Sequence, residues 1–301
     1  MFARPGLPSF EYVRPGIAAD VVSLLEEHGD NARPLMGGTD LFPSLRDGVL
    51  CPKILVDVKY LPGMRDINYS QQAGLIVGAA VTMNALARHA DVRTHYSLLA
   101  EAAESVASYQ LRNRATLGGN LCNASPCADT SPATLVLEAE FMLYGPSGKR
   151  SVPASKFFVG PGKTVLLPGE LMRANRFPPP PVGAAGRYLK LGRCKSGDLA
   201  LVGVAFLGAP NAARRAAAQG YSFRIGLGSV APTPLRALEA EAILAANSPG
   251  EGAFALAADK AMATAAPITD VRGSADYQKA MVRALTLRGL REVWAQLKER
   301  A

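Results

Sequence analysis

Cysteine and histidine are scarce in this sequence, and each shortage excludes a class of protein. Only four of the 301 residues are cysteines, namely Cys51, Cys122, Cys127 and Cys194. They are too few and too dispersed for a disulfide framework, so we expect reduced thiols. The three histidines show neither the spacing of a metal site nor an acid–base pair, and no Ser/His/Asp arrangement is visible.

Long apolar runs and a leader segment are also missing. The sequence contains no run of eighteen or more apolar residues, which a transmembrane helix would need. Its N-terminus, Met-Phe-Ala-Arg-Pro, lacks the charged and then apolar layout of a signal peptide. We therefore expect a cytoplasmic protein with no transmembrane segment.

Basic residues outnumber acidic residues without forming a cluster. The formal net charge is +8, but lysine and arginine are scattered, and no basic run is interleaved with aromatic residues. This pattern gives no support to a nucleic-acid partner. A ligand that carries phosphate, or an acidic partner subunit, fits the charge better.

Length and pattern divide the chain into three lobes, because 301 residues are many for one hydrophobic core. In the first lobe, residues 1–58, strands and helices alternate, which predicts a small parallel βαβ unit. Its strands are expected at 9–12, 34–36 and 54–58, and its helices at 17–27 and 40–46.

The second lobe, residues 59–177, is expected to be a larger α/β unit. Hairpins are predicted near its start and its end, with helices between them. The hairpins pair 66–69 with 75–79 and 141–144 with 150–152, and the helices cover 82–90, 95–107 and 133–138. Four consecutive prolines at 178–181 follow, and they predict a stiff linker.

The third lobe, residues 182–301, is expected to combine an antiparallel sheet with helices. Strands are predicted at 199–207 and 221–227, and the most regular helices at 236–246 and 277–297. The sequence 226–231 matches Gly-x-Gly-x-x-Ala, the dinucleotide fingerprint, which needs a helix that begins inside it. Because Pro232 and Pro234 prevent that helix, we interpret the match as a strand end and a turn. The whole chain is therefore an α+β protein.

Residues 116–132 are rich in small, hydrogen-bonding and chain-bending side chains. Gly118 and Gly119 let the backbone approach a ligand, and they tolerate the positive φ angles that turn successive N–H groups toward an anion. Asp129 is a good N-cap residue before Pro132, so a helix start is expected next. On its own the stretch fits either a binding loop or a Gly-Gly turn that leads into a capped helix.

A second loop of this kind lies earlier in the chain. It has the sequence Met36-Gly37-Gly38-Thr39-Asp40-Leu41-Phe42-Pro43. Each of the two loops stands between a short apolar run and a helix start. Such a pair of loops predicts a site in which both loops bind the same pyrophosphate.

The two loops also carry a family resemblance. Gly-Gly-Thr-Asp-Leu, together with Thr-Leu-Gly-Gly-Asn and Ala-Ser-Pro-x-x-Asp-x-x-Pro, resembles the FAD-binding subunits of the molybdenum hydroxylases. These include the medium chain of carbon monoxide dehydrogenase and the flavin domain of xanthine dehydrogenase. The similarity runs from near residue 6 to about residue 295. It implies a two-lobed FAD-binding domain, followed by an α+β C-terminal lobe.

The resemblance also implies which residues bind FAD. The pyrophosphate and ribityl groups would lie against two sets of residues, namely Leu35, Met36, Gly37, Gly38, Thr39, Asp40 and Leu41, and Ala115, Thr116, Gly118, Gly119 and Asn120. Both loops would offer backbone N–H groups at a helix start to the two negative charges of the diphosphate. Asp129 would accept hydrogen bonds from hydroxyl groups of the cofactor, and it also fits a simple helix cap.

Two further cofactor contacts follow from the same resemblance. Lys190 would reach the flavin, where a cation stabilises the anionic reduced form. The alternative is a solvated basic turn in which Asp198 is a local cap. Met172 would be an apolar contact to the cofactor, although core packing explains it equally well.

The cysteines do not predict an iron–sulfur cluster on this chain. Cys122 and Cys127 lie close together, but Cys51 and Cys194 are distant in sequence, and no inserted loop is present. The resemblance therefore implies that the molybdenum–pterin centre and the 2Fe-2S clusters lie on partner chains, a large and a small subunit.

The resemblance implies that the chain is an oxidoreductase subunit that carries electrons. Electrons would pass from the clusters of a partner to the FAD, and then to a soluble acceptor such as NAD or a quinone. One alternative is a stand-alone FAD oxidase or reductase of the related two-lobed type, which would need its own acid or base. Another is a non-catalytic binding module in which both Gly-Gly loops are structural turns.

Overall fold

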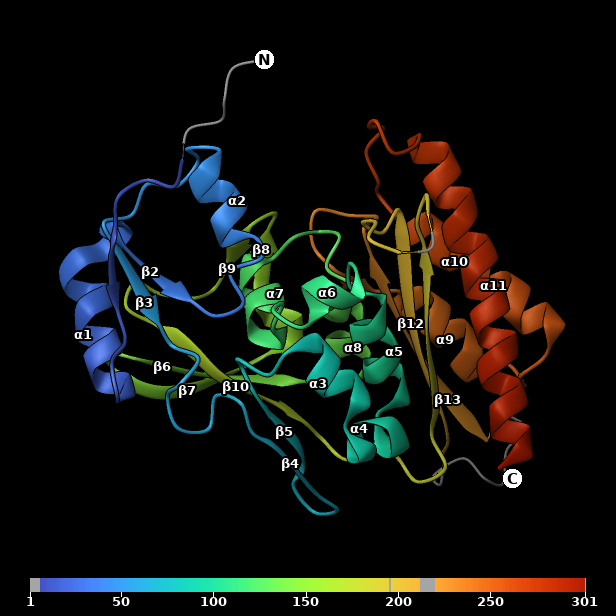
Figure 1. The fold of residues 1–301 in the computed structure, drawn as a ribbon. Coiled ribbons are helices and arrows are strands. Elements are labelled where there is room, and N and C mark those ends of the chain that lie inside the picture. Colours follow the sequence, from blue (N-terminus) through green and yellow to red (C-terminus); the bar gives the residue numbers. More distant parts are fainter. Residues whose placement is uncertain (1–5, 195, 212–219, 301) are drawn as a thin grey trace.

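The computed structural model describes residues 6–194, 196–211 and 220–300. Within them the chain forms sheets of three, five and four strands, with a two-stranded ribbon beside the second sheet. Figure 1 shows these sheets side by side in the order of the sequence, with helices between the second and the third. The architecture is α+β, as expected.

The first lobe is a parallel sheet with strand order β1-β3-β2. Its elements are β1 (Glu11–Val13), α1 (Ala18–His28), a 3₁₀ turn (Gly29–Asn31), β2 (Ala32–Leu35), α2 (Leu41–Arg46) and β3 (Ile54–Asp57). Helix α1 buries Val21, Val22 and Leu25, and it ends at Gly29, whose φ of +50° suits glycine. The alternation of strands and helices therefore predicted this lobe well.

The second sheet is antiparallel, with strand order β4-β5-β10-β6-β7. Its strands and the neighbouring ribbon are β4 (Ile67–Ser70), β5 (Gly74–Gly78), β6 (Glu140–Gly145), β7 (Gly148–Pro153), β8 (Phe158–Gly160), β9 (Lys163–Thr164) and β10 (Leu171–Phe177), with a 3₁₀ turn at Ala154–Lys156. Both predicted hairpins are present. The central strand, β10, was not predicted, because its alternation is broken by a register shift between Met172 and Ala174.

Six short helices belong to the second lobe, and several of them lie between this sheet and the third (Figure 1). They are α3 (Met83–Arg88), α4 (Ala90–His95), α5 (Ser97–Ser105), α6 (Tyr109–Arg112), α7 (Leu117–Asn123) and α8 (Thr130–Val136). The helix predicted at 82–90 is shorter than expected. His89 is extended, with φ −65° and ψ 130°, and it separates α3 from α4.

Part of the glycine-rich stretch predicted as a loop is helical. Thr116 caps α7, because its hydroxyl accepts a hydrogen bond from the N–H of Gly119. Neither Gly118 nor Gly119 has a positive φ angle, so the left-handed conformation that they tolerate is not adopted. The helix expected after Asp129 is present, and Asp129 is the N-cap residue of α8, but its side chain makes no capping hydrogen bond.

The third sheet is antiparallel and lies between two layers of helices (Figure 1). Its elements are β11 (Ala185–Leu191), β12 (Val202–Pro210), β13 (Tyr221–Gly228), β14 (Leu235–Arg236), α9 (Leu238–Ala246), α10 (Glu251–Thr264) and α11 (Ala275–Glu299). Helices α5 and α8 pack on one face, and α9 and α11 pack on the other. Strand β13 ends at Gly228 without a following helix, which confirms that the fingerprint match is only a turn.

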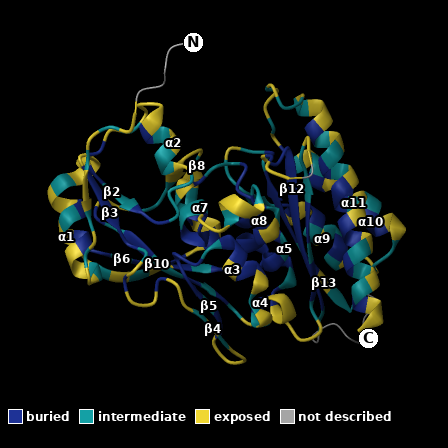
Figure 2. Ribbon diagram, viewed as in Figure 1, coloured by how far each residue is buried: buried dark blue, intermediate teal, exposed yellow. Residues whose placement is uncertain are grey.

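The buried apolar side chains form two clusters. One contains residues of both the first and the second sheet, and the other fills the space around the third sheet. In Figure 2 the buried residues follow the sheets and the helices between them. Because one cluster spans the first two sheets, the lobe boundary at residue 58 stays a prediction. No described helix is both long and apolar enough to cross a membrane.

The closest helix contact on the third sheet gives a stability prediction. A Cβ atom on Gly289 of α11 would lie 2.1 Å from the ring of Phe206, which is buried in β12. Gly289→Ala is therefore expected to push α11 away from the sheet and to lower the free energy of unfolding by about 1–3 kcal/mol. Urea unfolding followed by circular dichroism measures this change.

The control is Gly252→Ala in α10, where a Cβ atom meets nothing within 4 Å. Alanine is the better helix former, so this variant should unfold at an equal or slightly higher urea concentration. Equal stability of the two variants would show that α11 adjusts freely against β12.

A candidate cofactor cavity between the first two lobes

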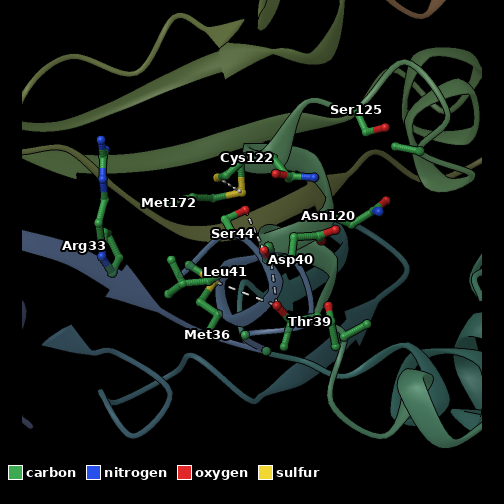
Figure 3. A pocket seen from close by; sticks show the side chains of 18 of the residues that line it. Arg33, Met36, Thr39, Asp40, Leu41, Ser44, Asn120, Cys122, Ser125 and Met172 are labelled. Atoms are coloured by element: carbon green, nitrogen blue, oxygen red, sulfur yellow. Dashed lines mark hydrogen bonds between the residues drawn. The ribbon is translucent and has the colours of Figure 1, made fainter. Parts of the chain in front are cut away.

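An open cavity of about 870 Å³ separates the first lobe from the second. Its walls are the loop before α2, the helix α7 and the loop between β9 and β10. Figure 3 shows Met36, Thr39 and Asp40 on one side of it, and Asn120 and Met172 on others. The volume is in the range of sites for large organic ligands.

Most of the residues predicted to bind a cofactor line this cavity. They are Met36, Gly37, Gly38, Thr39, Asp40, Leu41, Ala115, Thr116, Gly119, Asn120, Asp129 and Met172. Among the described residues Leu35, Gly118 and Lys190 do not line it. The structure thus brings together two segments that are far apart in the sequence.

The two glycine-bearing loops touch each other directly. A Cβ atom on Gly37 would lie 2.3 Å from the carbonyl oxygen of Arg114, so only glycine fits at this approach. The hydroxyl of Thr116 lies 3.9 Å from the sulfur of Met36. Gly38 has a φ of +76°, the left-handed conformation that glycine adopts most easily.

The first loop presents unpaired backbone donors. Within the described part of the chain, the N–H groups of Gly37, Gly38, Thr39 and Asp40 donate to no acceptor of the protein. They are consecutive and belong to residues that line the cavity. Successive N–H groups of this kind are a binding site for an anion.

The second loop does not present such donors. The N–H groups of Leu117 and Gly118 donate to the carbonyl oxygens of Val81 and Ala79. Those of Gly119 and Asn120 donate to Thr116. The expectation that both loops offer N–H groups is therefore wrong for the second, whose first helical turn is already satisfied by the protein.

Gly118 has a packing role instead. A Cβ atom on it would lie 2.6 Å from the side chain of Ala79, so the glycine allows α7 to approach the segment after β5. This close packing supports the wall of the cavity from behind.

Asp129 is the buried carboxylate of the cavity. One of its oxygens accepts a hydrogen bond from the hydroxyl of Tyr188, and the other accepts one from the ammonium of Lys190, both at 2.8 Å. Burial raises the pKa of Asp129 to about 6, although Lys190 and Tyr188 both act to lower it. The sequence suggested Tyr188 or Tyr109 only as a cover for a flavin ring, and the hydrogen bond from Tyr188 to Asp129 was not predicted, since the two residues lie 59 positions apart in the sequence.

The ammonium group of Lys190 is fully hydrogen-bonded within the protein. Its ammonium donates to the carboxylate of Asp129 and to the carbonyl oxygens of Ser105 and Asp198, at 2.8–2.9 Å. All three of its N–H bonds are used in this way, so none is left for a ligand. Neither the predicted flavin contact nor the alternative of a solvated turn describes this arrangement.

Asp198 lies at the rim of the same cavity. Its carboxylate accepts hydrogen bonds from the backbone and the guanidinium of Arg193, and from the backbone N–H of Leu199. The hydrogen bonds from Arg193 lower the pKa of Asp198 to about 2. The carboxylate therefore stays ionised and fixes the turn after β11.

The sulfur atoms at the cavity do not form a metal site. Cys122 points its thiol at the sulfur of Met172, 3.9 Å away, and burial raises the pKa of this thiol to about 12. The sulfur of Cys127 accepts a hydrogen bond from Arg272 at 2.7 Å. Among the described residues, no group of three His, Cys, Asp or Glu side chains could hold a metal ion.

The sequence did not predict one part of the cavity lining. This part consists of Asp30 and Arg33 in the first lobe and of residues 166–170 in the second. Figure 3 shows Arg33 well apart from the Met36–Asp40 loop. No short motif marks these residues, although the turn residues Pro168 and Gly169 are visible in the sequence.

Comparisons with known proteins agree with this geometry. The family described as FAD binding domain in molybdopterin dehydrogenase matches residues 8–180. The family described as CO dehydrogenase flavoprotein C-terminal domain matches residues 187–293. The first range holds the cavity lining except residues 197–199, and the second holds the third sheet except the first two residues of β11.

Curated relatives match over almost their full length. The carbon monoxide dehydrogenase medium chain of Hydrogenophaga pseudoflava is 36% identical over 96% of this chain and 98% of its own. The putative xanthine dehydrogenase FAD-binding subunit XdhB of Escherichia coli is 31% identical over 94% of this chain and 96% of its own.

Solved structures also match over almost the full length of the chain. The carbon monoxide dehydrogenase chain of Hydrogenophaga pseudoflava superposes with a TM-score of 0.90, over 97% of this chain and 99% of that chain, at 36% identity. Quinoline 2-oxidoreductase from Pseudomonas putida 86 gives 0.87, over 96% and 98%, at 29% identity. The chain therefore belongs to the family of FAD-binding flavoprotein subunits of the molybdenum hydroxylases, which are oxidoreductases.

Proposed function

We propose that this chain binds one FAD in the cavity and passes electrons between iron–sulfur clusters on a partner chain and an external acceptor. The observation that carries this proposal is the row of unpaired N–H groups at Gly37, Gly38, Thr39 and Asp40. A pyrophosphate is an anion with several acceptor oxygens, and it satisfies such a row without a counter-cation.

The residues of the cavity fit the other parts of FAD as well. Asp129 is held in the wall, where its carboxylate would accept hydrogen bonds from hydroxyl groups of the ribityl chain. Met36 and Met172 provide soft apolar contacts for a ring system. Asp40 also lines the cavity, and burial raises the pKa of its carboxyl.

Bound FAD supplies a group that accepts and releases electrons singly or in pairs, and the protein orients it. The described lining of the cavity contains no histidine, lysine or tyrosine. Asp129, whose pKa is raised to about 6, is the lining carboxylate nearest to a base for neutral pH, but both of its oxygens already accept hydrogen bonds from Tyr188 and Lys190. An electron carrier needs no base for a substrate of its own, so this composition favours transfer over substrate chemistry.

The relatives are named as a medium chain or an FAD-binding subunit, which supports the presence of partner chains. We propose that the chain assembles with a large molybdenum–pterin subunit and a small 2Fe-2S subunit, as a medium chain does. The final acceptor is a soluble one, such as NAD or a quinone. The net charge of +8 suits an acidic partner surface.

Flavin binding by the isolated chain tests the first half of this proposal. The chain is purified, stripped of any flavin and titrated with FAD while the flavin fluorescence is followed. We expect saturation at one FAD per chain, and weaker binding of FMN, which has no pyrophosphate. A folded chain that binds no FAD would contradict the assignment.

Turnover measurements test the second half. Chain loaded with FAD and reduced with dithionite is expected to pass electrons to a soluble acceptor, but to oxidise no small substrate without partner chains. Steady turnover of a small substrate by the isolated chain would instead identify a stand-alone oxidase or reductase.

A further inference from the structure

We infer that Tyr188 is a positioning residue for FAD, which acts through Asp129 although it does not line the cavity. The inference rests on the proposed FAD site and names a residue in the third sheet that controls it. Tyr188 lies on β11, and its side chain is buried.

The geometry leaves the carboxylate of Asp129 little freedom. The hydroxyl of Tyr188 donates to Oδ1 and the ammonium of Lys190 donates to Oδ2, each at 2.8 Å. Both donors come from β11, two residues apart, so they approach from the same side of the strand. The lone pairs that remain on the carboxylate are the ones available to a ligand in the cavity.

Tyr188 itself cannot move away. Its hydroxyl lies so close to Gly203 of β12 that a Cβ atom there would be 2.4 Å from it. The backbone N–H of Tyr188 donates to Glu101 of α5 at 2.8 Å. The position of the hydroxyl is therefore set by the third sheet and by α5 together.

The C-terminal part of the chain also holds residues 126–129, the segment that carries Asp129. The N–H of Ser229 donates to the carbonyl oxygen of Pro126 at 2.8 Å, and Arg272 donates to the sulfur of Cys127 at 2.7 Å. Residues 126–129 are thus fixed at three points by the C-terminal part of the chain. FAD binding depends in this way on residues that never touch the cofactor.

The arrangement makes a prediction about pH. An ionised Asp129 accepts more hydrogen bonds from the cofactor than a protonated one, so FAD affinity falls as the pH drops through the pKa of this carboxyl. Lys190 and Tyr188 face it from β11, and Cys127 acts on the hydroxyl of Tyr188. Asp40 titrates elsewhere in the cavity and acts in the opposite sense, because its protonation favours an anionic ligand.

Tyr188→Phe tests the inference, because it removes one hydroxyl and keeps the ring. Without this donor the pKa of Asp129 rises, so we expect FAD to bind about fivefold more weakly at pH 7, the value of one hydrogen bond. The pH midpoint of FAD affinity should move upward relative to the wild type. The measurement is the dissociation constant from fluorescence titrations between pH 5 and pH 8.

Tyr96→Phe is the matched control. Tyr96 is equally buried, and its hydroxyl donates to the carbonyl oxygens of Phe177 and Pro178, away from the cavity. Its FAD affinity and pH midpoint should equal those of the wild type, even if its stability falls.

Three results would overturn the inference. One is an unchanged FAD affinity in Tyr188→Phe. A second is weaker binding with an unmoved pH midpoint, which would show a purely structural role. A third is the same shift in Tyr96→Phe. If the wild type binds no FAD at all, the proposed function itself fails, and this outcome is distinct from all three.

Discussion

Gly37→Ala is expected to weaken FAD binding about a hundredfold, which corresponds to about 2.7 kcal/mol. The new methyl group would lie 2.3 Å from the carbonyl oxygen of Arg114, which belongs to the backbone and cannot rotate away. The loop must therefore shift, and its row of N–H groups shifts with it. Each hydrogen bond from such a row to a charged oxygen contributes about 1.5–3 kcal/mol, so one or two lost bonds explain the effect.

The measurement is again the dissociation constant from fluorescence titration, with unfolding monitored in parallel. Gly16→Ala serves as the control, because a Cβ atom there meets nothing within 4 Å and the φ angle is ordinary. If Gly37→Ala is folded and binds FAD as tightly as the control, the row at Gly37–Asp40 does not hold the pyrophosphate.

Lys190→Met is expected to lower the free energy of unfolding by about 3–5 kcal/mol at pH 8. The substitution keeps the length of the side chain but leaves the carboxylate of Asp129 without its cationic partner. That carboxylate belongs to a residue only 5% exposed. A buried charge without a partner is one of the most destabilising features that a single substitution creates.

The loss of stability in Lys190→Met should become larger as the pH rises. The folded-state pKa of Asp129 is about 6, above the ordinary value of 3.8, and removal of Lys190 raises it further. A carboxyl whose pKa is raised by folding makes its full contribution to stability below pH 3.8. This contribution is lost as the pH rises through the folded-state pKa. The difference between the variant and the wild type should therefore grow above pH 6, by at most about 2.7 kcal/mol between pH 6 and pH 8, because one proton contributes about 1.36 kcal/mol per pH unit.

Two further variants complete this test. Asp129→Asn combined with Lys190→Met removes both charges and should recover most of the lost stability, since a neutral pair leaves no charge buried. Lys149→Met changes an exposed lysine and should alter stability by less than about 0.5 kcal/mol. If Lys190→Met is as stable as Lys149→Met at pH 8, the pair does not stabilise the fold.

The sequence predicted the first lobe well because its signals are local. Apolar spacing and Gly29 define α1, and the alternation with short apolar strands predicts the parallel sheet. The convergence of the two glycine-rich segments was also anticipated, and the contact between Gly37 and Arg114 shows it directly. Motif spacing carries this kind of information even when the path between the motifs is unknown.

The errors arise where distant contacts decide the local structure. Gly118 and Gly119 favour a loop by composition, yet Thr116 caps a helix there and Ala79 packs against it. Glycine is a poor helix former, so tertiary packing overrides its propensity at this point. Of the two loops, only the first therefore keeps a row of unpaired N–H groups that would suit an anion.

The partners of Asp129 could not have been predicted from spacing. Its local sequence suits a helix cap, but Tyr188 and Lys190 take its oxygens from a strand that the sequence pattern did not reveal. Strand β11 lies at the edge of its sheet and packs on α5 and α11, so its burial pattern has no clean alternation.

The place of β10 in the second sheet constrains the order in which the chain can fold during synthesis. This strand lies between β5 and β6, although it follows both in the sequence (Figure 1). Until residue 177 has left the ribosome, the hairpins β4–β5 and β6–β7 each keep an unpaired edge that β10 later covers. Such edges are sites of mispairing between nascent chains, so this part of the protein is most prone to aggregate before its last strand has been made.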